Sequence, residues 1–485
     1  MNKQSNTIKY WTYAILIFIM ILITSCDNPT KVKSYSVSGT VYANNNFGIE
    51  NATILIYNYL FPDDATNSFK ELYPNHGSDL KFYNLFDHRN SNPIAQTLSS
   101  NDGIFSFQNI PKGVYIIVAY KSGYGFRYLD NIKVSENISS LRIDILPIID
   151  LPATISSNID LVDNRFYSIT SDLIILSGVT VNIGRNVTLV VSPLKKIEIY
   201  GTLEISEEGS LLVMSMDSLY THSQQYSSIG KFDSITFINQ ESKVIRNIKV
   251  INSELGIRFS YSSNITMCNS YVSSEYQCVA VSSSPNFHLL QCSITNATDT
   301  MRGAVFIENS SGSVIECCHI FNNKIGAQIS YSQNVQVYNN YFTSNSIYDF
   351  GFAQDGVGTV EYNTFKNSQT AIYNYRGQMY ANYNDIEAVT GIFAERVNAW
   401  FSAKFNNLKC SKYGIKSRCM FYHSPIMHLE GTNNYWYTYN IDEIEELIYD
   451  RNDDSESDEN YYLLVTVVDY LPISYTANRA GIYNQ

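Results

Sequence analysis

Two glutamates, Glu316 and Glu361, are the residues of this sequence best placed for acid–base chemistry. Both occupy the same position of a repeat of about 22 residues, and Tyr338 holds that position in the repeat between them. Stacked repeats place equivalent residues ~4.8 Å apart, so the two carboxyl groups are predicted to lie roughly 9–10 Å apart. Glycoside hydrolysis with inversion uses two carboxyl groups about 6.5–9.5 Å apart. Glu316 and Glu361 are therefore the catalytic candidates, although chance alone supplies such a pair easily.

A second group of residues is suited to sugar binding. The outward positions of another strand in the last repeats carry aromatic rings beside cations, with Arg376 and Arg396 at the turns. Rings stack on apolar sugar faces, and cations pair with acidic sugars. The alternative is a strip that the C-terminal tail covers. Earlier repeats offer Ser260, Ala280, Ser282 and Val305 at comparable positions. The predicted binding residues are Tyr373, Tyr375, Phe393, Glu395, Lys416 and Arg418.

No metal site is predicted. Seven cysteines follow Cys26, and none of them shows the Cys-x-x-Cys spacing of zinc sites. A disulfide is an alternative in an oxidising compartment, but we expect most of them to be small buried side chains. His76 and His88 lie in a long polar insertion and are expected to face solvent. The acidic stretch around Asp453 and Asp454 is typical of a solvated loop, where loosely bound Ca²⁺ is the one cofactor considered.

Internal repeats between residues 149 and 435 predict the elements that position these side chains. Seven small or amide residues occupy the same position of successive repeats, at spacings of 22, 26, 22, 23, 21 and 22. Three residues before each stands an apolar residue, and the residue before that is mostly polar. Inside–outside alternation at the same place in every repeat predicts one strand per repeat, stacked in parallel. The seven residues, expected at one corner, are Ser270, Cys292, Cys318, Asn340, Asn363, Asn384 and Asn406.

A period near 22 with several short strands and no helical periodicity predicts a parallel β-helix. A leucine-rich repeat would need a leucine-dominated pattern, which is missing. Stacked asparagines at the corner can bond from turn to turn, and Cys292 and Cys318 would fill the same corner. Residues 171–215 resemble the opening of right-handed parallel β-helix proteins of the pectin-lyase-like group, and residues 433–472 resemble their C-terminal end, except that Tyr437 replaces a usual glycine.

The pectin-lyase-like resemblance implies a fold and does not decide an activity, because this fold carries polysaccharide lyases, glycosidases and many proteins without activity. The carboxylate cluster of calcium-dependent lyases does not occur on the repeats, and neither do the catalytic blocks of polygalacturonases. The sequence therefore favours a binding protein over an enzyme.

The segment before the repeats has the pattern of a small β-sandwich, with short alternating strands separated by Gly, Pro and Asn turns. The segments SGTVY, NATILIY and SSNDGIFSFQNIPKGVYIIVAYKSGY resemble the carboxypeptidase regulatory-like, transthyretin-like domain over residues 34–148. In that family the module is usually a spacer or adhesion unit.

The N-terminus has the pattern of a secretory signal. Lys3 and Lys9 precede an apolar stretch from Ala14 to Met20, and Leu22-Ile-Thr-Ser-Cys26 follows. It resembles the bacterial lipoprotein signal, which implies that Cys26 is acylated and anchors the protein in the cell envelope, at the outer membrane or cell surface. The alternative is an uncleaved signal anchor, but the apolar run is short for a span of about 20 residues.

The predicted fold class is all-β, a small N-terminal sandwich followed by a right-handed parallel β-helix. With 485 residues, a net charge of −12 and no basic patch, a nucleic-acid partner is not expected. We predict a lipoprotein whose β-helix is a rigid binding or adhesion scaffold, with a polysaccharide or another cell-surface ligand as its partner. The first alternative is a polysaccharide lyase or glycoside hydrolase with an unfamiliar site, and the second is a scaffold without a glycan role. The predicted segments are the signal 1–26, a tether 27–33, the sandwich 34–148, the β-helix 149–435 and a cap 436–485.

Overall fold

The computed structural model describes residues 33–43, 46–59, 71–79, 88–220, 230–396, 399–421, 426–453, 463–464 and 466–482. Cys26 with the whole predicted signal, and Asp454 of the acidic stretch, lie outside these residues. The chain forms two compact units. Among the described residues, the first unit comprises 33–43, 46–59, 92–121 and 126–145, and the second comprises 71–79, 88–91, 122–125 and those from 146 onward. Residues 71–79 and 88–91, which interrupt the first unit in the sequence, thus belong to the second.

The first unit consists of two sheets, with strand orders β4-β1-β7 and β3-β2-β5-β6. Both sheets bury apolar side chains. Strand β1 alternates and buries Val37 and Val41, whereas β2, an inner strand of its sheet, buries the successive residues 54–57. The strands are β1 Ser34–Tyr42, β2 Thr53–Asn58, β3 Ala95–Leu98, β4 Ile104–Pro111, β5 Gly113–Tyr120, β6 Arg127–Val134 and β7 Ile138–Asp144. The 3₁₀ turn at His88–Asn90 belongs to the second unit.

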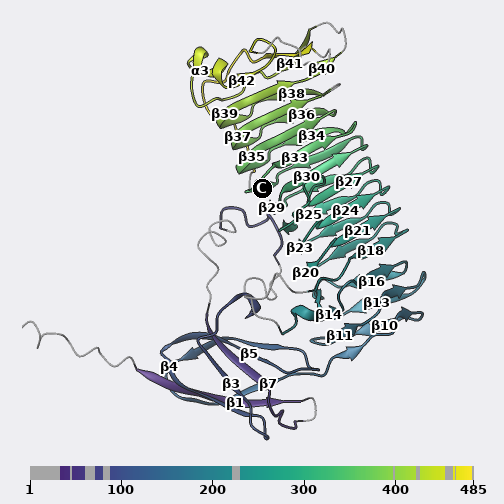
Figure 1. Ribbon diagram of the computed structural model, residues 1–485, viewed down its shortest axis with the longest axis vertical. Coiled ribbons are helices and arrows are strands. Elements are labelled where there is room, and N and C mark those ends of the chain that lie inside the picture. The colour runs from purple at the N-terminus through teal and green to yellow at the C-terminus, as the bar shows by residue number, and fades with distance from the viewer. Residues whose placement is uncertain are drawn as a thin grey trace, which may run out of the picture. The chain divides into compact units, whose positions relative to one another are not determined.

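The second unit is a solenoid in which parallel strands of successive coils pair with one another (Figure 1). This confirms the all-β fold class and the parallel stacking that the repeat predicts. One side of the solenoid is a three-stranded sheet followed by a ten-stranded sheet. Their strands are β10 Ile159–Leu161, β13 Thr180–Ile183, β16 Thr202–Ile205, β19 Val244–Arg246, β22 Thr266–Cys268, β25 His288–Leu290, β28 Val314–Glu316, β31 Val335–Tyr338, β34 Val357–Glu361, β36 Gln378–Asn382, β38 Trp400–Lys404, β41 Met427–Glu430 and β44 Thr466–Asp469.

The other strands of the solenoid form a 22-stranded sheet with two strands per coil. We call the two series the first row and the second row. The first row is β11 Phe166–Ile169, β14 Val187–Val191, β17 Leu211–Ser215, β20 Ile248–Ser253, β23 Tyr271–Ser274, β26 Ser293–Thr295, β29 His319–Phe321 and β32 Tyr341–Thr343. The second row is β12 Leu173–Ile175, β15 Ile197–Ile199, β18 Ile235–Ile238, β21 Ile257–Ser260, β24 Val279–Ser282, β27 Val305–Glu308, β30 Ile325–Ser330 and β33 Tyr348–Ala353.

In the last coils the two rows merge into long bent strands, which continue the first row at their beginning and the second row at their end. These are β35 Thr364–Tyr375, β37 Asp385–Glu395 and β39 Asn407–Arg418. The remaining elements are β8 Ile149–Asp150, β9 Thr154–Ile155, β40 Met420–Phe421, α3 Ile441–Glu446, β42 Ile448–Tyr449, β43 Leu463–Leu464 and a 3₁₀ turn at Met216–Ser218.

Asparagine side chains stack inside one corner of the solenoid, as the sequence predicts. Asn340 donates through Nδ2 to Oδ1 of Asn363 at 3.0 Å, and the same bond links Asn363 to Asn384 at 3.1 Å. The ladder continues through Asn406 to Asn434. All five amides are fully buried, so the ladder satisfies polar groups that would otherwise be costly inside a core.

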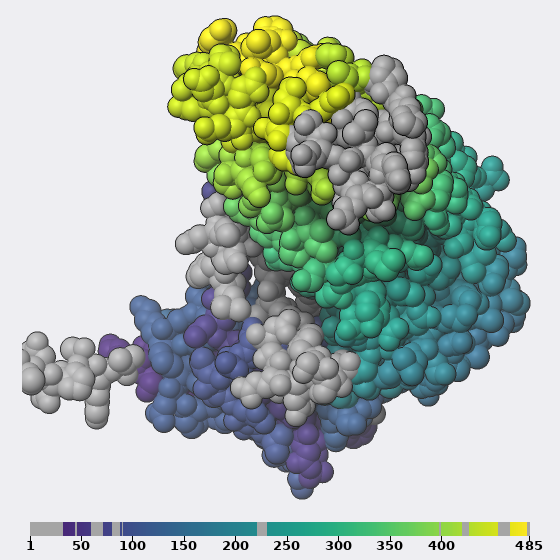
Figure 2. Space-filling model, turned by 45° about the horizontal axis from the view of Figure 1, so that its top comes forward, coloured from purple at the N-terminus to yellow at the C-terminus, as the bar shows by residue number. Residues whose placement is uncertain are grey.

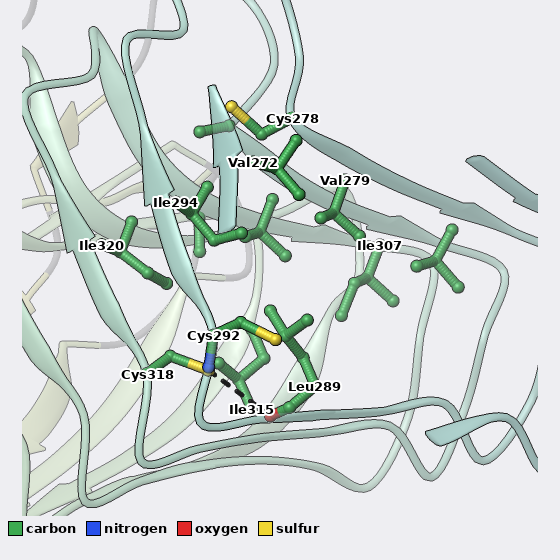
Figure 3. Close-up of a cluster of buried hydrophobic side chains, with 14 of the residues drawn as sticks. Val272, Cys278, Val279, Leu289, Cys292, Ile294, Ile307, Ile315, Cys318 and Ile320 are labelled. Atoms are coloured by element: carbon green, nitrogen blue, oxygen red, sulfur yellow. Dashed lines mark hydrogen bonds between the residues drawn. The ribbon is translucent and has the colours of Figure 1, made fainter. Parts of the chain in front are cut away.

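The cysteines are free thiols in the described part of the chain, so the disulfide alternative is not realised. Cys292 and Cys318 are fully buried in the predicted corner, and the backbone amide of Cys292 donates to Sγ of Cys318 at 3.4 Å. Figure 3 shows both sulfurs beside Leu289 and Ile315 in the apolar core. Burial raises the pKa of the Cys318 thiol, which fits a packing role.

Two expectations about exposure are wrong. His76 and His88 are buried, at 1% exposure each, because the insertion that carries them packs onto the solenoid. Val305 is fully buried, and Phe306 takes the outward position instead. The strand pairing aligns Gly326 with Ala304, and not with Gly303 as the sequence pattern suggests. The coil between Cys292 and Cys318 is 26 residues long, and its extra residues shift the alignment by one.

The C-terminal residues close the last coil (Figure 2, yellow). Strand β42 pairs with β39, and α3 begins at Asn440, whose side chain accepts from the amide of Asp442. Trp436 is 2% exposed and packs against Gly414, where a Cβ would lie 2.4 Å from its ring. Tyr437 has φ 62°, the left-handed conformation that favours glycine, which explains why a glycine is usual at this position.

Candidate functional site

The carboxylate column consists of Glu316, Tyr338 and Glu361 on adjacent strands β28, β31 and β34, in the register that the sequence predicts. Each glutamate has a partner on its own sheet. Glu316 Oε2 lies 3.0 Å from Nε2 of His288, and Glu361 Oε1 accepts from Nδ2 of Asn382 at 3.1 Å. The structure therefore brings the two candidates into one column, with Tyr338 between them.

The aromatic strip consists of Tyr373, Tyr375, Phe393, Glu395, Lys416 and Arg418. These side chains form two columns at the ends of β35, β37 and β39, one of them running Tyr373, Phe393, Lys416 and the other Tyr375, Glu395, Arg418. All six are half-buried. Alternation along each strand puts their neighbours Ile372, Ile392 and Ile415 into the core. The structure thus gathers all six predicted binding residues on one surface.

Rings and cations of the aromatic strip contact one another. The rings of Tyr373 and Phe393 lie 5.4 Å apart between centroids. Lys416 Nζ lies 4.7 Å from the centroid of Phe393 and 5.4 Å from those of Tyr413 and Tyr449. These are cation–π distances, so aromatic faces hold the ammonium group in place.

Positive charge is crowded at this end of the solenoid. Burial lowers the pKa of Lys416, and the charges of Arg418 and Lys412 lower it further. The carboxylate of Glu395 accepts a hydrogen bond from the Tyr373 hydroxyl at 2.8 Å, and burial together with this contact raises the pKa of Tyr373. An anion beside Lys416 would relieve the repulsion between the cations.

Residues 478–482 of the C-terminal tail lie at the other end of the long strands. Asn478 donates its amide to Oδ1 of Asn407 at 2.8 Å, and Ile482 donates to Oγ1 of Thr364 at 3.2 Å. Asn407 and Thr364 begin β39 and β35, whereas the aromatic strip is at the ends of these strands. Residues 478–482 therefore do not cover the strip. Another part of the C-terminal segment adjoins it, because β42 pairs with Ile415 and Lys416 of β39 and the Tyr449 ring lies against Lys416.

Sequence reasoning missed a cluster of charged residues under this tail. Asp385 and Glu387 project from β37, and Lys409 of β39 forms an ion pair with Glu387 at 2.9 Å. Burial raises the pKa of Asp385, and the charges of Lys366 and Lys409 oppose that rise. The signal was present, because Asp-Ile-Glu directly follows the corner residue Asn384, but the insertion and tail that surround it are distant in sequence.

The described residues contain no group of three or more His, Cys, Asp and Glu side chains that could hold a metal ion. No helix among them has the length and apolar character to cross a bilayer.

Comparison with known proteins supports the fold. Residues 233–387 match the family model of the right-handed β-helix region, so the solenoid is a right-handed β-helix. A crystal structure of the periplasmic alginate epimerase AlgG aligns with 11% sequence identity and a TM-score of 0.29, over 70% of this chain and 76% of that chain. The search of curated proteins found no match.

Proposed function

We propose that this protein is a lipid-anchored scaffold of the bacterial cell envelope whose aromatic strip binds an acidic polysaccharide. The observation that carries the proposal is the position of two ammonium groups over aromatic faces: Lys416 lies over Phe393 and Tyr413, and Lys412 lies over Tyr413. Burial, and then the charges of Arg418 and Lys412, lower the pKa of Lys416. Repulsion between these neighbouring cations destabilises their charged forms, and a bound polyanion would offset that repulsion.

Sugar chemistry matches the strip in two ways. The half-buried rings of Tyr373, Tyr375 and Phe393 offer apolar surface for the CH faces of pyranoses. Lys416 and Arg418 would pair with the carboxylates of uronic acids, and the planar guanidinium of Arg418 can do so with two hydrogen bonds. Successive strands are ~4.8 Å apart, so a chain lying along the solenoid axis would contact one strand after another.

The anchor completes this proposal. Acylation at Cys26 would hold the mature chain on a membrane, since each buried CH₂ contributes about 0.8 kcal/mol. The first unit would then act as a spacer between the lipid and the β-helix. Labelling of the growing cell with a clickable fatty acid tests the anchor: Cys26→Ala should abolish incorporation, and unchanged incorporation would contradict it.

Binding is tested with polygalacturonate and alginate as acidic probes and with a mixed-linkage glucan as the neutral probe. Phe393→Ala and the double variant Lys416→Gln/Arg418→Gln should each weaken retention of the acidic probes about tenfold in affinity electrophoresis. Tyr276→Ala and Lys324→Gln are matched controls, because both side chains are exposed on other parts of the solenoid. Equal retention of the variants and the native protein would refute binding at the aromatic strip.

A further inference from the structure

A groove crosses four successive coils where the first row passes into the second row. It is lined by residues 345–346, 367–369, 387–389 and 409–411 and has a volume of about 690 Å³. Ligand sites of proteins typically have volumes of about 300–1,000 Å³. Successive coils are ~4.8 Å apart, so the groove extends roughly 14 Å along the solenoid axis. We call it the bend groove, and its length suits an extended chain better than a single small molecule.

Two β-bulges open the bend groove. Asn367 is an extra residue of β35 relative to β37, and its φ of 58° is left-handed. Strand β39 likewise has one extra residue between Cys410 and Tyr413. Asn367 and Ser411 are both exposed, and both belong to the lining. Bulges commonly re-aim side chains beside functional sites, and here they turn polar groups towards the groove.

The side chains that line the bend groove have no net charge. Two of them are charged, Glu387 and Lys409, and these pair with each other at 2.9 Å. The exposed side chains of Asn367, Gln369 and Ser411 are neutral, and each can donate and accept hydrogen bonds. The aromatic strip, by contrast, gathers cations. The bend groove therefore suits a neutral molecule that is rich in hydroxyl groups.

The less exposed part of the lining is partly apolar and partly held in position. Ala388 is buried and Val389 is half-buried, so the CH groups of a sugar find an apolar surface here. Asn345 and Ser368 are buried, and they donate to Oδ1 of Asp349 at 2.7 and 2.6 Å. A surface that is already ordered loses little conformational entropy when a ligand binds.

An exposed tyrosine lies beside one end of the bend groove. Tyr435 forms a parallel bridge with Asn407 of β39, and Tyr437 follows two residues later. Burial raises the pKa of Tyr437, and the charges of Asp385 and Glu387 add to that rise, so the phenol lies near both carboxyl groups. Tyr437 is nevertheless 49% exposed. It is thus close to the bend groove, with much of its surface accessible to a ligand.

The backbone conformation of Tyr437 has a cost that a glycine would avoid. Its φ of 62° lies in the left-handed region, where a Cβ crowds the backbone. The chain nevertheless has an aromatic ring here, which packs against the ring of Tyr435 with the centroids 4.7 Å apart. Backbone strain of this kind is often retained where a functional site uses the side chain. The Tyr437 ring therefore offers a sugar an apolar face at the end of the groove.

We propose that the bend groove binds a neutral polysaccharide, with its chain along the solenoid axis and one pyranose ring stacked on Tyr437. Neighbouring hydroxyl groups of a sugar unit donate to Glu387 and accept from Lys409. The exposed amide and hydroxyl groups of the lining bind further hydroxyl groups of the chain. This site is separate from the aromatic strip and does not rest on polyanion binding there.

Titration calorimetry of the purified full chain tests this site with three neutral probes, mixed-linkage glucan, xyloglucan and galactomannan. At least one of them should bind. Tyr437→Gly should weaken that binding about tenfold. It should leave the midpoint of thermal unfolding unchanged or higher, because glycine adopts this φ without strain. Tyr261→Gly is the matched control and should bind like the native protein, since Tyr261 is also exposed, has a φ of 53° and lies between β21 and β22.

A second pair of variants tests the groove itself. Ser411→Trp places a large ring among the lining residues and should lower the affinity for the bound neutral probe by about tenfold or more. Ser157→Trp, at an exposed residue just before β10, is the matched control and should keep the native affinity.

Absence of binding to all three neutral probes would overturn the proposal, as would equal affinities of Ser411→Trp and the native protein. A lower unfolding midpoint of Tyr437→Gly with unchanged affinity would show that this ring packs and does not stack on a sugar. Polygalacturonate separates the two sites. Ser411→Trp should keep its affinity for polygalacturonate, and Lys416→Gln/Arg418→Gln should keep its affinity for the neutral probe. Loss of one site leaves the other proposal standing.

Discussion

The two ends of strands β35, β37 and β39 carry opposite kinds of surface. At their beginnings, Asp385 and Glu387 are accompanied by Lys366 and Lys409, so positive and negative charges balance under the insertion and the tail. At their ends, Lys416 and Arg418 share one side with Lys412, and burial and like charge lower the pKa of Lys416. One strand of a β-helix can therefore contribute to two surfaces of different charge, since the bend in its middle turns the two halves to different faces.

The bend between these surfaces contains a buried carboxyl group, Asp349. It occupies a position where the neighbouring coils have Gly326 and Ala371, both small. Its Oδ1 accepts from Nδ2 of Asn345 at 2.7 Å and from the hydroxyl of Ser368 at 2.6 Å. It thus ends a second asparagine ladder, in which Asn323 donates to Asn345. Burial raises the pKa of Asp349 to about 8.

The largest predicted effect is the pH dependence of the free energy of unfolding that Asp349 causes. Its folded pKa of about 8 exceeds the ordinary pKa of an aspartate, about 3.9, so its contribution to the free energy of unfolding is complete below that ordinary pKa and is lost as the pH rises towards 8. Asp349→Asn should remove this dependence, with an upper bound of roughly 5 kcal/mol between pH 4 and 9. Urea unfolding at several pH values measures it, with Asp355→Asn, an exposed aspartate, as the control. Parallel pH profiles for Asp349→Asn and the native protein would contradict this assignment.

The next effect concerns the asparagine ladder that supports both surfaces. Asn363 precedes β35 and makes hydrogen bonds to the carbonyls of Val337 and Glu361 as well as to Asn384. Asn363→Ala should leave these buried groups without partners and lower the free energy of unfolding by about 2–4 kcal/mol. Thermal unfolding measures the loss, and Gln369→Ala, an exposed residue of β35, should change the midpoint by less than about 1 °C. A midpoint for Asn363→Ala equal to that of the control would show that the ladder does not stabilise the coil.

The smallest effect separates the two surfaces by their response to salt. Raising NaCl from about 50 to 500 mM shortens the Debye length roughly threefold and should weaken binding of polygalacturonate to the aromatic strip about tenfold. The Glu387–Lys409 pair is internally neutral, so Lys409→Gln should change the affinity for polygalacturonate less than about twofold at either salt concentration. Titration calorimetry gives both values. Equal losses of affinity from Lys409→Gln and Lys416→Gln would remove the distinction between the surfaces.

Much of the solenoid could be predicted because its repeat of about 22 residues is visible in the sequence. The corner column from Ser270 to Asn406 and the register of Glu316, Tyr338 and Glu361 follow from spacing alone. The prediction failed at Val305, since the longer coil hid where its extra residues belong. A shift of one residue exchanges the two faces of a strand, so small alignment errors invert burial completely.

The sequence by itself determined the parallel coil, its corner of asparagines and cysteines, and which residues align in the carboxylate column and in the aromatic strip. These features depend on contacts between neighbouring coils, whose equivalent residues are about 22 positions apart. Only the tertiary structure decided what covers each face. It buried His76, brought Tyr73 against Tyr341, and laid Gly481 beside Asp385. Contacts between segments far apart in the chain leave no periodic trace in a sequence, and the pKa of a carboxyl group depends on such contacts.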